Sequence, residues 1–524
     1  MIISCFRKRY LAFFFLLLSG TMSVFAQQNP VRSVRPNIIV FLVDDMGWQD
    51  CSVPFWTKLT EFNKRYHTPN MERLAKEGMK FTNAYSTPVC TPTRVSLLTG
   101  MNASHHGVTN WTSPRKNNST DNADEQMVAA KWNINGLSPI TGFNNTVCAT
   151  PLPQLLKDAG YFTIHTGKAH WGPMGTPGAN PYNLGFMVNI AGHSAGHPQS
   201  YLGKDNFGNN GGKTGDQAVP DLEEYFGTDT FLTEALTLEA IKSMEAPVTN
   251  KQPFFLHLAH YAIHLPFDKD QRYFQKYIDA GLSETEAKYA SLIEGMDKSL
   301  GDIMDFLQKK KVDKNTIIIF MSDNGGFSMA PRTGVPFSHN YPLKSGKGSV
   351  YEGGIREPML VKWPGVAKPG SVAEQYVIIE DFFPTILQMA GIEKYTTKQT
   401  IDGKSFVSVL KNNNFSDSTR SLVWHYPNKW NSQGGPGIDY KSAIRKGNWK
   451  LVYNMRTGKN ELYNLQDDIG EANDLSERFF EKTKQMAKLL TNELKKNNAL
   501  MPSFRDTGKQ VPWPDEADNI IRKQ

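Results

Sequence analysis

Continuous apolar runs mark the buried strands of this chain. Residues 38–43 (IIVFLV) and 317–321 (IIIFM) contain no polar side chain, and the run PFFLHL at 253–258 is interrupted only by His257. Strands buried on both faces have this pattern, which is typical of parallel sheets covered by helices. A fourth strand is predicted at 161–166. The pattern therefore predicts an α/β protein with a central, mostly parallel sheet.

Between these runs, apolar residues recur at the three- and four-residue spacing of amphipathic helices. Such helices are predicted at 68–80, 229–247, 284–311 and 377–391. Two long stretches without this periodicity, 102–150 and 172–220, are rich in small polar residues, Gly and Pro, and we expect them to form loops.

The character of the chain changes near residue 412. Four short strands and one helix are predicted beyond it, at 422–426, 442–446, 449–454, 461–465 and 475–496, and the tail after residue 500 is expected to be loosely ordered. We therefore predict a catalytic domain over 27–411 and a smaller C-terminal α+β subdomain with an antiparallel sheet over 412–524.

Residues 1–26 have the features of a signal peptide. Three basic residues at 7–9 precede the apolar run LAFFFLLLSG, and the small residues Val24 and Ala26 precede a predicted cleavage ahead of Gln27. The run is short for spanning a bilayer, so a membrane anchor is the less favoured alternative. The prediction is export to the periplasm or the medium, without stable membrane insertion.

Composition and charge narrow the function further. The chain has 524 residues, 39% of them hydrophobic and 11% aromatic, which is typical of a folded protein with a large core. Removal of residues 1–26 lowers the net charge from +7 to +4, which suits anionic substrates but gives no reason to expect nucleic acid binding. Three cysteines remain, and Cys51 and Cys148 could pair or stay free if Cys90 has a separate role.

The stretch YSTPVCTPTRVSLLTG at 85–100 places a nucleophile at the start of a helix. Thr91 is a suitable N-cap, and Gly100 is a suitable C-terminal stop. Cys90 should then lie just before the helix N-terminus, where free N–H groups and partial positive charge favour an anion. Arg94, one turn later, can grip the same anion. For this stretch alone, a buried structural cysteine is the alternative.

Two predicted strands end in pairs of oxygen-bearing side chains. Asp44 and Asp45 follow the first run, and Asp323 and Asn324 follow the run at 317–321. Because the carboxyl ends of parallel strands lie at one edge of a sheet, these four side chains can meet there. Two adjacent carboxylates repel each other unless a cation lies between them, although the first pair alone could instead cap a turn. Hard oxygen ligands favour Ca²⁺, with Mg²⁺ as the alternative.

Basic and imidazole side chains also follow the strands. Lys168 and His170 come after the strand at 161–166 and, being two residues apart, can face one side of an extended segment. His264 comes after the run at 253–258. His193 and His197 lie in the long loop at 172–220, where we predict substrate contact, with metal binding or a plain surface position as alternatives.

These elements together resemble the type I sulfatases. The segment C-T-P-T-R at 90–94, followed by a small apolar run and T-G, resembles the family's C-x-P-x-R signature. The segment G-K-G-S-V-Y-E-G-G-I-R-E-P at 346–358 resembles its second signature, and by that match Lys347 is the substrate-binding lysine. The resemblance covers about residues 37–392 and implies an alkaline-phosphatase-like α/β sandwich.

One motif departs from the family pattern. G-K-A-H at 167–170 is similar to the family's G-K-x-H, but Ala169 stands where an aromatic residue is usual. Trp171 and Gly172 follow the histidine in place of the usual Leu-Gly. This departure concerns the shape near the site and leaves the two reactive groups in place.

The resemblance implies a role for each candidate residue. Cys90 is oxidised after synthesis to formylglycine (3-oxoalanine), whose hydrate is the nucleophile, so a formylglycine-generating enzyme is an implied partner. The implied roles are metal binding for Asp44, Asp45, Cys90, Asp323 and Asn324, and catalysis for Cys90, Arg94, Lys168, His170, His264 and Lys347. Within the catalytic set, Arg94 and Lys168 hold the hydrate, His264 with Lys347 protonates the leaving alcohol, and His170 takes the proton that releases sulfate.

The leading hypothesis is a sulfatase that acts on a sulfated carbohydrate. The second is a phosphomonoester or phosphodiester hydrolase of the same superfamily, although such phosphatases usually carry Thr or Ser where this chain has Cys90. A protein that only binds sulfated glycans is a third hypothesis. A hydrolase that uses the Cys90 thiolate is a fourth, but it leaves both acidic strand ends unexplained.

Overall fold

The computed structural model describes residues 35–517 except 211–212 and 431–433, so the predicted signal peptide lies outside the described residues. The α-helices are α1 (Glu61–Arg65), α2 (Pro69–Glu77), α3 (Cys90–Thr99), α4 (Ala103–His106), α5 (Leu152–Asp158), α6 (Leu232–Thr249), α7 (Phe274–Asp279), α8 (Glu284–Lys309), α9 (Glu352–Ile355), α10 (Phe382–Met389), α11 (Val407–Lys411) and α12 (Phe480–Lys496). The longer strands are β1 (Asn37–Val43), β2 (Met79–Tyr85), β6 (Phe162–Gly167), β10 (Phe254–Ala259), β11 (Thr316–Ser322), β12 (Arg356–Lys362), β15 (Ser421–Tyr426), β16 (Lys441–Lys446), β17 (Trp449–Asn454) and β18 (Lys459–Asn464). The short strands are β3 (Met127–Val128), β4 (Leu137–Ser138), β5 (Val147–Cys148), β7 (Val188–Ile190), β8 (Asn209–Asn210), β9 (Lys213–Thr214), β13 (Ser371–Ala373), β14 (Val377–Ile378) and β19 (Ser503–Phe504).

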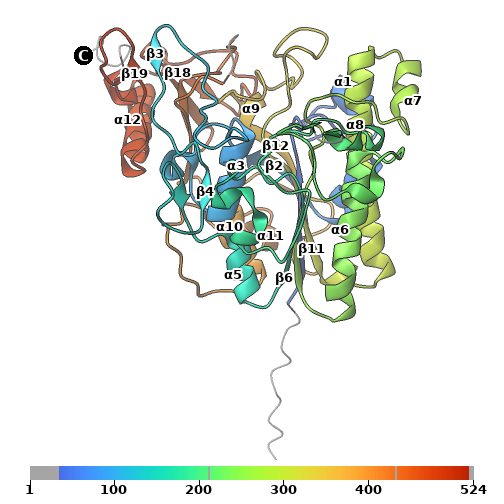
Figure 1. The fold of residues 1–524 in the computed structure, drawn as a ribbon. Helices are drawn as coiled ribbons and strands as arrows, with labels where there is room; N and C mark the ends of the chain where they lie inside the picture. Colours follow the sequence, from blue (N-terminus) through green and yellow to red (C-terminus); the bar gives the residue numbers. More distant parts are fainter. Residues whose placement is uncertain (1–34, 211–212, 431–433, 518–524) are drawn as a thin grey trace, which may run out of the picture. The chain divides into compact units, whose positions relative to one another are not determined.

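The central sheet has nine strands in the order β13-β2-β12-β11-β1-β10-β6-β7, with β14 also paired to β2. The strands β11, β1, β10, β6 and β7 are parallel neighbours, whereas β12 runs antiparallel to both β11 and β2. The predicted central, mostly parallel sheet is therefore confirmed. Its four predicted strands end at one edge, where the chain leaves each strand for a loop (Figure 1).

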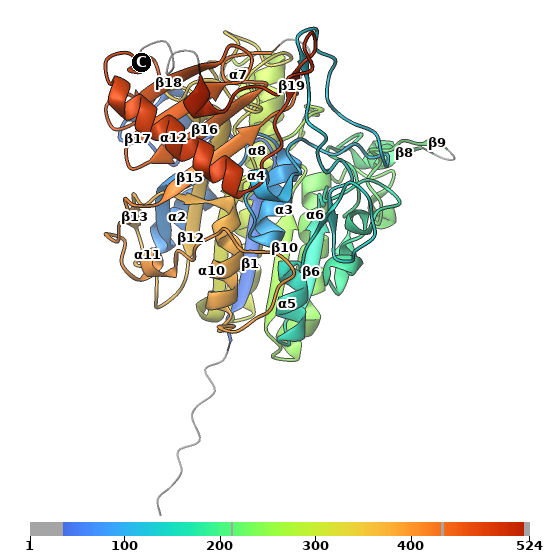
Figure 2. The ribbon, with the colours of Figure 1, turned by 90° about the vertical axis from the view of Figure 1, so that its left-hand side faces the viewer.

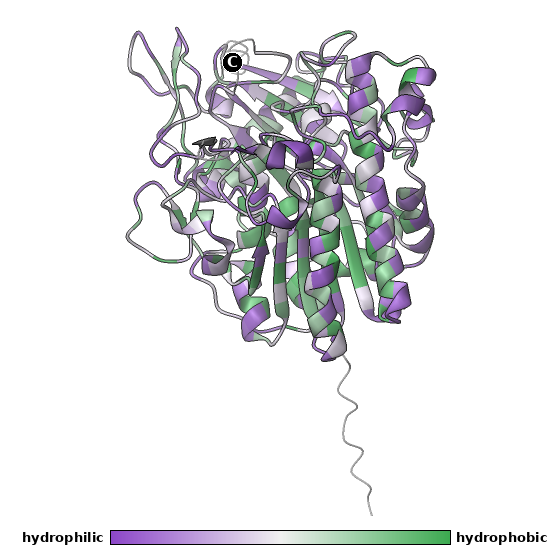
Figure 3. Cartoon of the chain, turned by 45° about the vertical axis from the view of Figure 1, so that its right-hand side comes forward, coloured by the Kyte–Doolittle hydropathy of each residue, from purple (hydrophilic) through white to green (hydrophobic). Residues whose placement is uncertain are grey.

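Helices cover both faces of this sheet (Figures 1 and 2). Along β1, the side chains of Ile38, Val40 and Leu42 pack in one core with apolar residues of α3, α5 and α10. The alternate side chains of β1 pack in a second core with α2, α6 and α8. Both faces of the strand are thus buried, which explains its unbroken apolar sequence. Figure 3 shows the strands as largely hydrophobic, while the covering helices carry both hydrophobic and hydrophilic residues.

The C-terminal part forms the predicted antiparallel sheet, in the order β15-β16-β17-β18. Side chains on one face of it, including Trp424, Ala443 and Val452, belong to the core on the α3 side of the central sheet. The other face, including Ile444 and Leu451, packs with α12. The domain boundary at 411/412 stays a prediction.

Three predicted elements differ from the structure. The stretch 377–391 begins with β14 and a 3₁₀ turn before α10, and the last helix begins at Phe480 rather than at 475. The tail after residue 500 is not loose in its described part, because β19 pairs with β3. Cys51 and Cys148, which could have paired, are both free thiols. Among the described residues, no helix is long and apolar enough to cross a membrane.

Candidate active site

The candidate site lies where the central parallel strands end. Asp44 and Asp45 follow β1, and Asp323 and Asn324 follow the neighbouring β11, with Val43 and Ser322 in register. The two turns are joined directly, since the backbone N–H of Asp323 donates to the Val43 carbonyl at 2.9 Å and that of Asp45 to Asp323 Oδ1 at 3.3 Å. The two pairs of oxygen-bearing side chains predicted to meet are therefore brought together.

Helix α3 begins two residues earlier than predicted. Its N-cap is Val89, so Cys90 is the first helical residue, and Thr91 lies inside the helix. The Thr91 hydroxyl instead lies 3.2 Å from His170 Nδ1 and accepts from the Thr112 N–H at 3.1 Å. Gly100 ends the helix in the left-handed conformation, as predicted. Cys90 thus lies in the first turn, where the backbone N–H groups have no partner within the helix.

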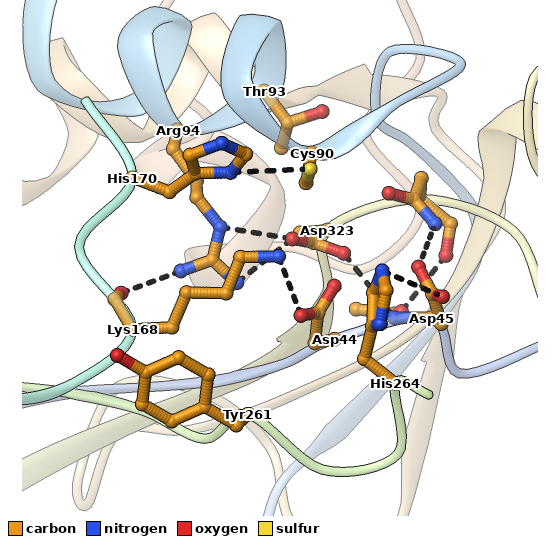
Figure 4. Close-up of polar contacts among 12 residues, drawn as sticks. Asp44, Asp45, Cys90, Thr93, Arg94, Lys168, His170, Tyr261, His264 and Asp323 are labelled. Atoms are coloured by element: carbon orange, nitrogen blue, oxygen red, sulfur yellow. Dashed lines mark hydrogen bonds and ion pairs between the residues drawn. The ribbon is translucent and has the colours of Figure 1, made fainter. Parts of the chain in front are cut away.

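Arg94 is fully buried and ties the helix to the sheet edge. Its Nε and Nη2 lie 2.9 and 2.8 Å from Asp323 Oδ2, and its Nη1 donates to the Lys168 carbonyl at 2.7 Å (Figure 4). Because all three nitrogens of the guanidinium are in contact with these two oxygens, its orientation is fixed. Arg94 therefore carries a rigid positive charge one helical turn from Cys90.

Two buried lysines, Lys168 and Lys347, pair with the two aspartates that follow β1. Lys168 Nζ donates to Asp44 Oδ2 at 2.5 Å, and Lys347 Nζ donates to Asp45 Oδ1 at 2.6 Å. Together with Arg94 and Asp323, the site holds three cationic and three carboxylate side chains, all buried. Buried charges persist only when they are paired or coordinated, and here each one has an opposite partner.

Three oxygens at this edge fit a cation. Asp44 Oδ1, Asp45 Oδ2 and Asn324 Oδ1 are buried and have no hydrogen-bond partner among the described residues. Asp44, Asp45 and His264 can also offer ligand atoms within 4.8 Å of one another. Unpaired buried oxygens are costly unless something compensates them, and hard oxygen donors of this kind suit Ca²⁺ or Mg²⁺. The donor set thus fits the divalent ion predicted from the two strand ends.

The pKa values of the two aspartates are shifted in opposite directions. Burial, followed by the negative charge of Asp323, raises the pKa of Asp44 well above its usual value, although Lys168 opposes the shift. Burial also acts to raise the pKa of Asp45, but Lys347 and His264 outweigh it and the pKa falls below its usual value. Asp44 is therefore the carboxylate that gains most from an added positive charge.

His170 faces Cys90 from the loop after β6. Its Nδ1 lies 3.4 Å from Cys90 Sγ, and its Nε2 lies 2.8 Å from the Thr112 carbonyl oxygen. Because a carbonyl only accepts, Nε2 carries the hydrogen and Nδ1 presents a lone pair to position 90. Burial, and then the charge of Lys168, lower the pKa of His170 well below its usual value, which favours this neutral form. The segment is not extended as predicted, since His170 has a φ of 54°.

His264 lies on the opposite side of the carboxylates. Its Nδ1 is 3.0 Å from the Leu265 carbonyl oxygen, so Nδ1 carries a hydrogen, while Nε2 is 3.6 Å from Asp45 Oδ2. Burial, followed by Lys347, lowers the pKa of His264 well below its usual value. The backbone at this position is held by the Tyr201 hydroxyl, which donates to the His264 carbonyl at 2.8 Å.

The loop at 172–220 reaches the site. The His197 ring stacks on the His264 ring, with centroids 5.5 Å apart and an interplanar angle of 10°. The His193 carbonyl accepts from the His170 N–H at 3.0 Å, and the His193 Nε2 is buried without a partner among the described residues. Substrate contact by these two histidines stays a prediction. Sequence patterns did not predict the contacts of Thr112 with His170 and of Tyr201 with His264, because single polar residues in loops carry no periodic signal.

A sulfatase family model matches residues 36–392, and a model named N-sulphoglucosamine sulphohydrolase, C-terminal, matches residues 345–499. A sulfatase of Formosa agariphila is 31% identical over 556 residues, covering 95% of this chain and 96% of the relative. The N-acetylgalactosamine-6-sulfatase of Mus musculus is 30% identical over 395 residues, covering 72% of this chain and 66% of the relative.

Solved structures agree with this relationship. The crystal structure of Ps i-CgsB has a TM-score of 0.69 and 26% identity, and covers 88% of this chain and 93% of its own. The same protein has been solved in complex with k-i-k-neocarrahexaose. The resemblance found in the sequence and the predicted alkaline-phosphatase-like fold are thus confirmed, and family members generally use a formylglycine and a metal ion. The chain therefore belongs to the sulfatase family and is a sulfuric ester hydrolase.

Proposed function

We propose that this sulfatase removes sulfate from a carbohydrate, using a formylglycine formed from Cys90 and a bound Ca²⁺. The observation that carries the proposal is the convergence of Cys90, Arg94, Lys168 and Lys347 on one buried edge beside three unpaired oxygens. The names of two similar proteins support a sugar substrate, one being an N-acetylgalactosamine-6-sulfatase and the other a structure containing neocarrahexaose.

The proposed metal ligands are Asp44, Asp45, Asn324 and Asp323, together with the modified residue 90. When bound, the ion supplies fixed positive charge next to the sulfate, with Mg²⁺ as the alternative to Ca²⁺. Asp323 Oδ2 faces Arg94, so the other oxygen, Oδ1, is the one directed toward the neighbouring Asp45 turn. Oxygen ligands from two strand ends suit an ion with a large and flexible coordination shell.

The conversion of Cys90 supplies a nucleophile that the thiol cannot. Burial raises the pKa of the Cys90 thiol, so it is a poor thiolate at neutral pH. When formed, a formylglycine hydrate at position 90 would supply two hydroxyl groups on one carbon, which is the chemistry that attack on sulfur and later release of sulfate require. Arg94 and Lys168 orient the group at position 90, and Lys347 neutralises the substrate anion.

The two histidines divide the proton transfers. His170 presents its Nδ1 lone pair to position 90 at 3.4 Å, which suits it to take the proton from the hydroxyl that remains after attack. His264 donates its Nδ1 hydrogen to the Leu265 carbonyl, so it protonates the leaving alcohol from Nε2 only as the imidazolium, with a second hydrogen on Nε2. The Asp45 carboxylate, 3.6 Å from Nε2, favours that charged form. Each histidine is held by a backbone carbonyl on its far side, so the direction of transfer is set by the fold.

The test is release of free sulfate and free phosphate from matched sulfated and phosphorylated galactose and N-acetylgalactosamine derivatives. The protein is co-expressed with a formylglycine-generating enzyme and supplied with Ca²⁺, and Cys90→Ala is the control. We expect sulfate release from one positional isomer and none from the control. Phosphate release without sulfate release would overturn the proposal in favour of a phosphohydrolase.

We also propose that the protein is exported to the periplasm or the medium, because residues 1–26 combine basic residues, an apolar run and a small-residue cleavage site. N-terminal sequencing of the protein from its native host should begin at Gln27. A chain that begins at Met1 would contradict export by cleavage.

A further inference from the structure

The walls around position 90 differ in chemical character. On the side of Lys347, the indole of Trp430 packs against Gly348, since a Cβ at residue 348 would lie 2.3 Å from Trp430 Cε3. Gly348 also donates its N–H to the Pro88 carbonyl at 2.7 Å, two residues before Cys90. Trp430 is therefore next to both the substrate-binding lysine and the nucleophile segment, and it is partly exposed.

Trp430 is held in place by the loop that supports His170. Its backbone N–H donates to Asp439 Oδ1 at 2.8 Å, and its carbonyl accepts from Asn122 Nδ2 at 2.8 Å. The Asn122 N–H in turn donates to the Lys429 carbonyl at 3.0 Å. The backbone at residue 430 is thus held at both its N–H and its carbonyl, and the indole is held by its contact with Gly348.

The wall on the side of His170 is polar. Thr112 and His193 contact His170 through their backbone carbonyls. In these two residues and their sequence neighbours, four buried polar side-chain atoms have no hydrogen-bond partner among the described residues. These atoms are Trp111 Nε1, Thr112 Oγ1, His193 Nε2 and Ser194 Oγ. Thr112 and Ser194 are fully buried, so their hydroxyls were removed from bulk water without gaining a protein partner. The surroundings of His170 are therefore polar and buried, in contrast to the partly exposed indole of Trp430.

We propose that Trp430 is the stacking platform for the sugar ring that carries the sulfate, and that it determines specificity for pyranose esters over acyclic ones. A pyranose has an apolar face of C–H groups and a rim of hydroxyls. The flat, partly exposed indole suits the C–H face, and Lys347, one residue from the Gly348 on which the indole packs, suits the sulfate group. The proposal rests on the proposed carbohydrate sulfatase activity and adds the residue, from the C-terminal part of the chain, that selects the sugar.

The test compares kcat/KM for the best sulfated pyranose with that for ethyl sulfate, an acyclic ester that also has an alkyl leaving group. Trp430→Ala should lower the value for the pyranose at least about tenfold more than the value for ethyl sulfate, mainly through KM, and Trp430→Phe should restore most of the loss. The matched control is Trp449→Ala, because Trp449 is also partly exposed but packs against Phe479 on the α12 side of the sheet. We expect it to leave the ratio unchanged.

An equal decrease in kcat/KM for both esters would mean that Trp430 only positions Lys347, and no decrease would mean that Trp430 does not contact the substrate. Either result overturns the proposal.

A second readout does not depend on turnover. Galactose 6-sulfate is titrated into the Cys90→Ala protein and followed by calorimetry, with and without Trp430→Ala. Weaker binding in the double variant supports the platform even if no ester is hydrolysed, whereas equal binding contradicts it. Absence of sulfate release by the wild type contradicts the proposed function separately.

Discussion

Replacement of Lys450 by Met tests how the C-terminal sheet is joined to the catalytic segment. Lys450 lies on β17 with its side chain fully buried, and its Nζ is 2.8 Å from Glu352 Oε1 and 2.8 Å from Glu471 Oε1. Glu352 opens α9, five residues after Lys347. Both carboxylates are also buried, so the variant removes the cation that pairs with Glu471 and leaves Glu352 with Arg356, 3.2 Å away.

Loss of one partner from a buried ion pair costs about 3–5 kcal/mol. At about 2.1 cal/mol/K per residue, the entropy of unfolding of a unit of this size is about 1 kcal/mol/K. The melting temperature of Lys450→Met should therefore be lower by roughly 3–5 °C at pH 8. Lys459→Met is the control, since Lys459 is exposed on β18, and it should melt with the wild type.

The loss should depend on pH because Glu471 titrates near neutrality. Burial raises the pKa of Glu471 to about 7 although Lys450 opposes the shift, while Lys450 and Arg356 outweigh burial and hold the pKa of Glu352 at about 2. A raised pKa in the folded state means that the protonated Glu471 contributes stability at low pH, and this contribution is lost as the pH rises through about 7. At pH 5 the variant leaves one buried carboxylate rather than two.

Thermal unfolding by circular dichroism at pH 5 and pH 8 measures both effects. We expect the decrease in melting temperature at pH 5 to be about half of that at pH 8. An equal decrease at the two pH values would refute the coupling between Lys450 and Glu471. A variant as stable as the wild type at pH 8 would refute the buried ion triad itself.

Three further predictions concern the catalytic edge. Asp45→Ala removes one of the unpaired oxygens, so bound metal measured by elemental analysis and sulfate release should both fall, and full metal occupancy would exclude Asp45 as a ligand. The control Asp302→Ala, at a partly exposed position on α8, should change neither. Arg94→Lys replaces a guanidinium that is fixed by three contacts, and the ammonium that takes its place cannot make all of them, so kcat should fall about 10²–10³-fold. Near-normal turnover would exclude Arg94 from transition-state stabilisation. His264→Ala should lower the rate of hydrolysis of alkyl sulfate esters, whose alcohols are poor leaving groups, about 10²–10⁴-fold, and that of aryl sulfate esters much less. An equal loss of rate on both kinds of ester would contradict the role of His264 as the general acid.

The strands and their ends could be predicted because their signal is local. The run from Ile38 to Val43 is apolar throughout since both faces are covered, and the same holds for the run at 317–321. The side chains that follow β1 (Asp44 and Asp45) lie next to those that follow β11 (Asp323 and Asn324) because the two strands are parallel neighbours. The sequence indicated parallel strands, but only the structure shows that β1 and β11 pair directly.

The parts that sequence could not predict depend on tertiary contacts. Thr91 has the chemistry of an N-cap, but its hydroxyl is used by His170 and Thr112 instead, so the helix begins at Cys90. The tail after residue 500 lacks periodicity and is ordered by pairing with β3. Trp430 follows no motif, and its position beside Gly348 arises from chain segments more than 80 residues apart.

The central claim is that Cys90 becomes the formylglycine nucleophile of a carbohydrate sulfatase. The most direct measurement is the mass of the tryptic peptide that contains residue 90, taken from protein purified from its native host and assayed in parallel for sulfate release. We expect a peptide lighter by about one water's mass and a preparation that releases sulfate from a sulfated sugar. An unmodified Cys90 in a preparation that still releases sulfate would contradict it.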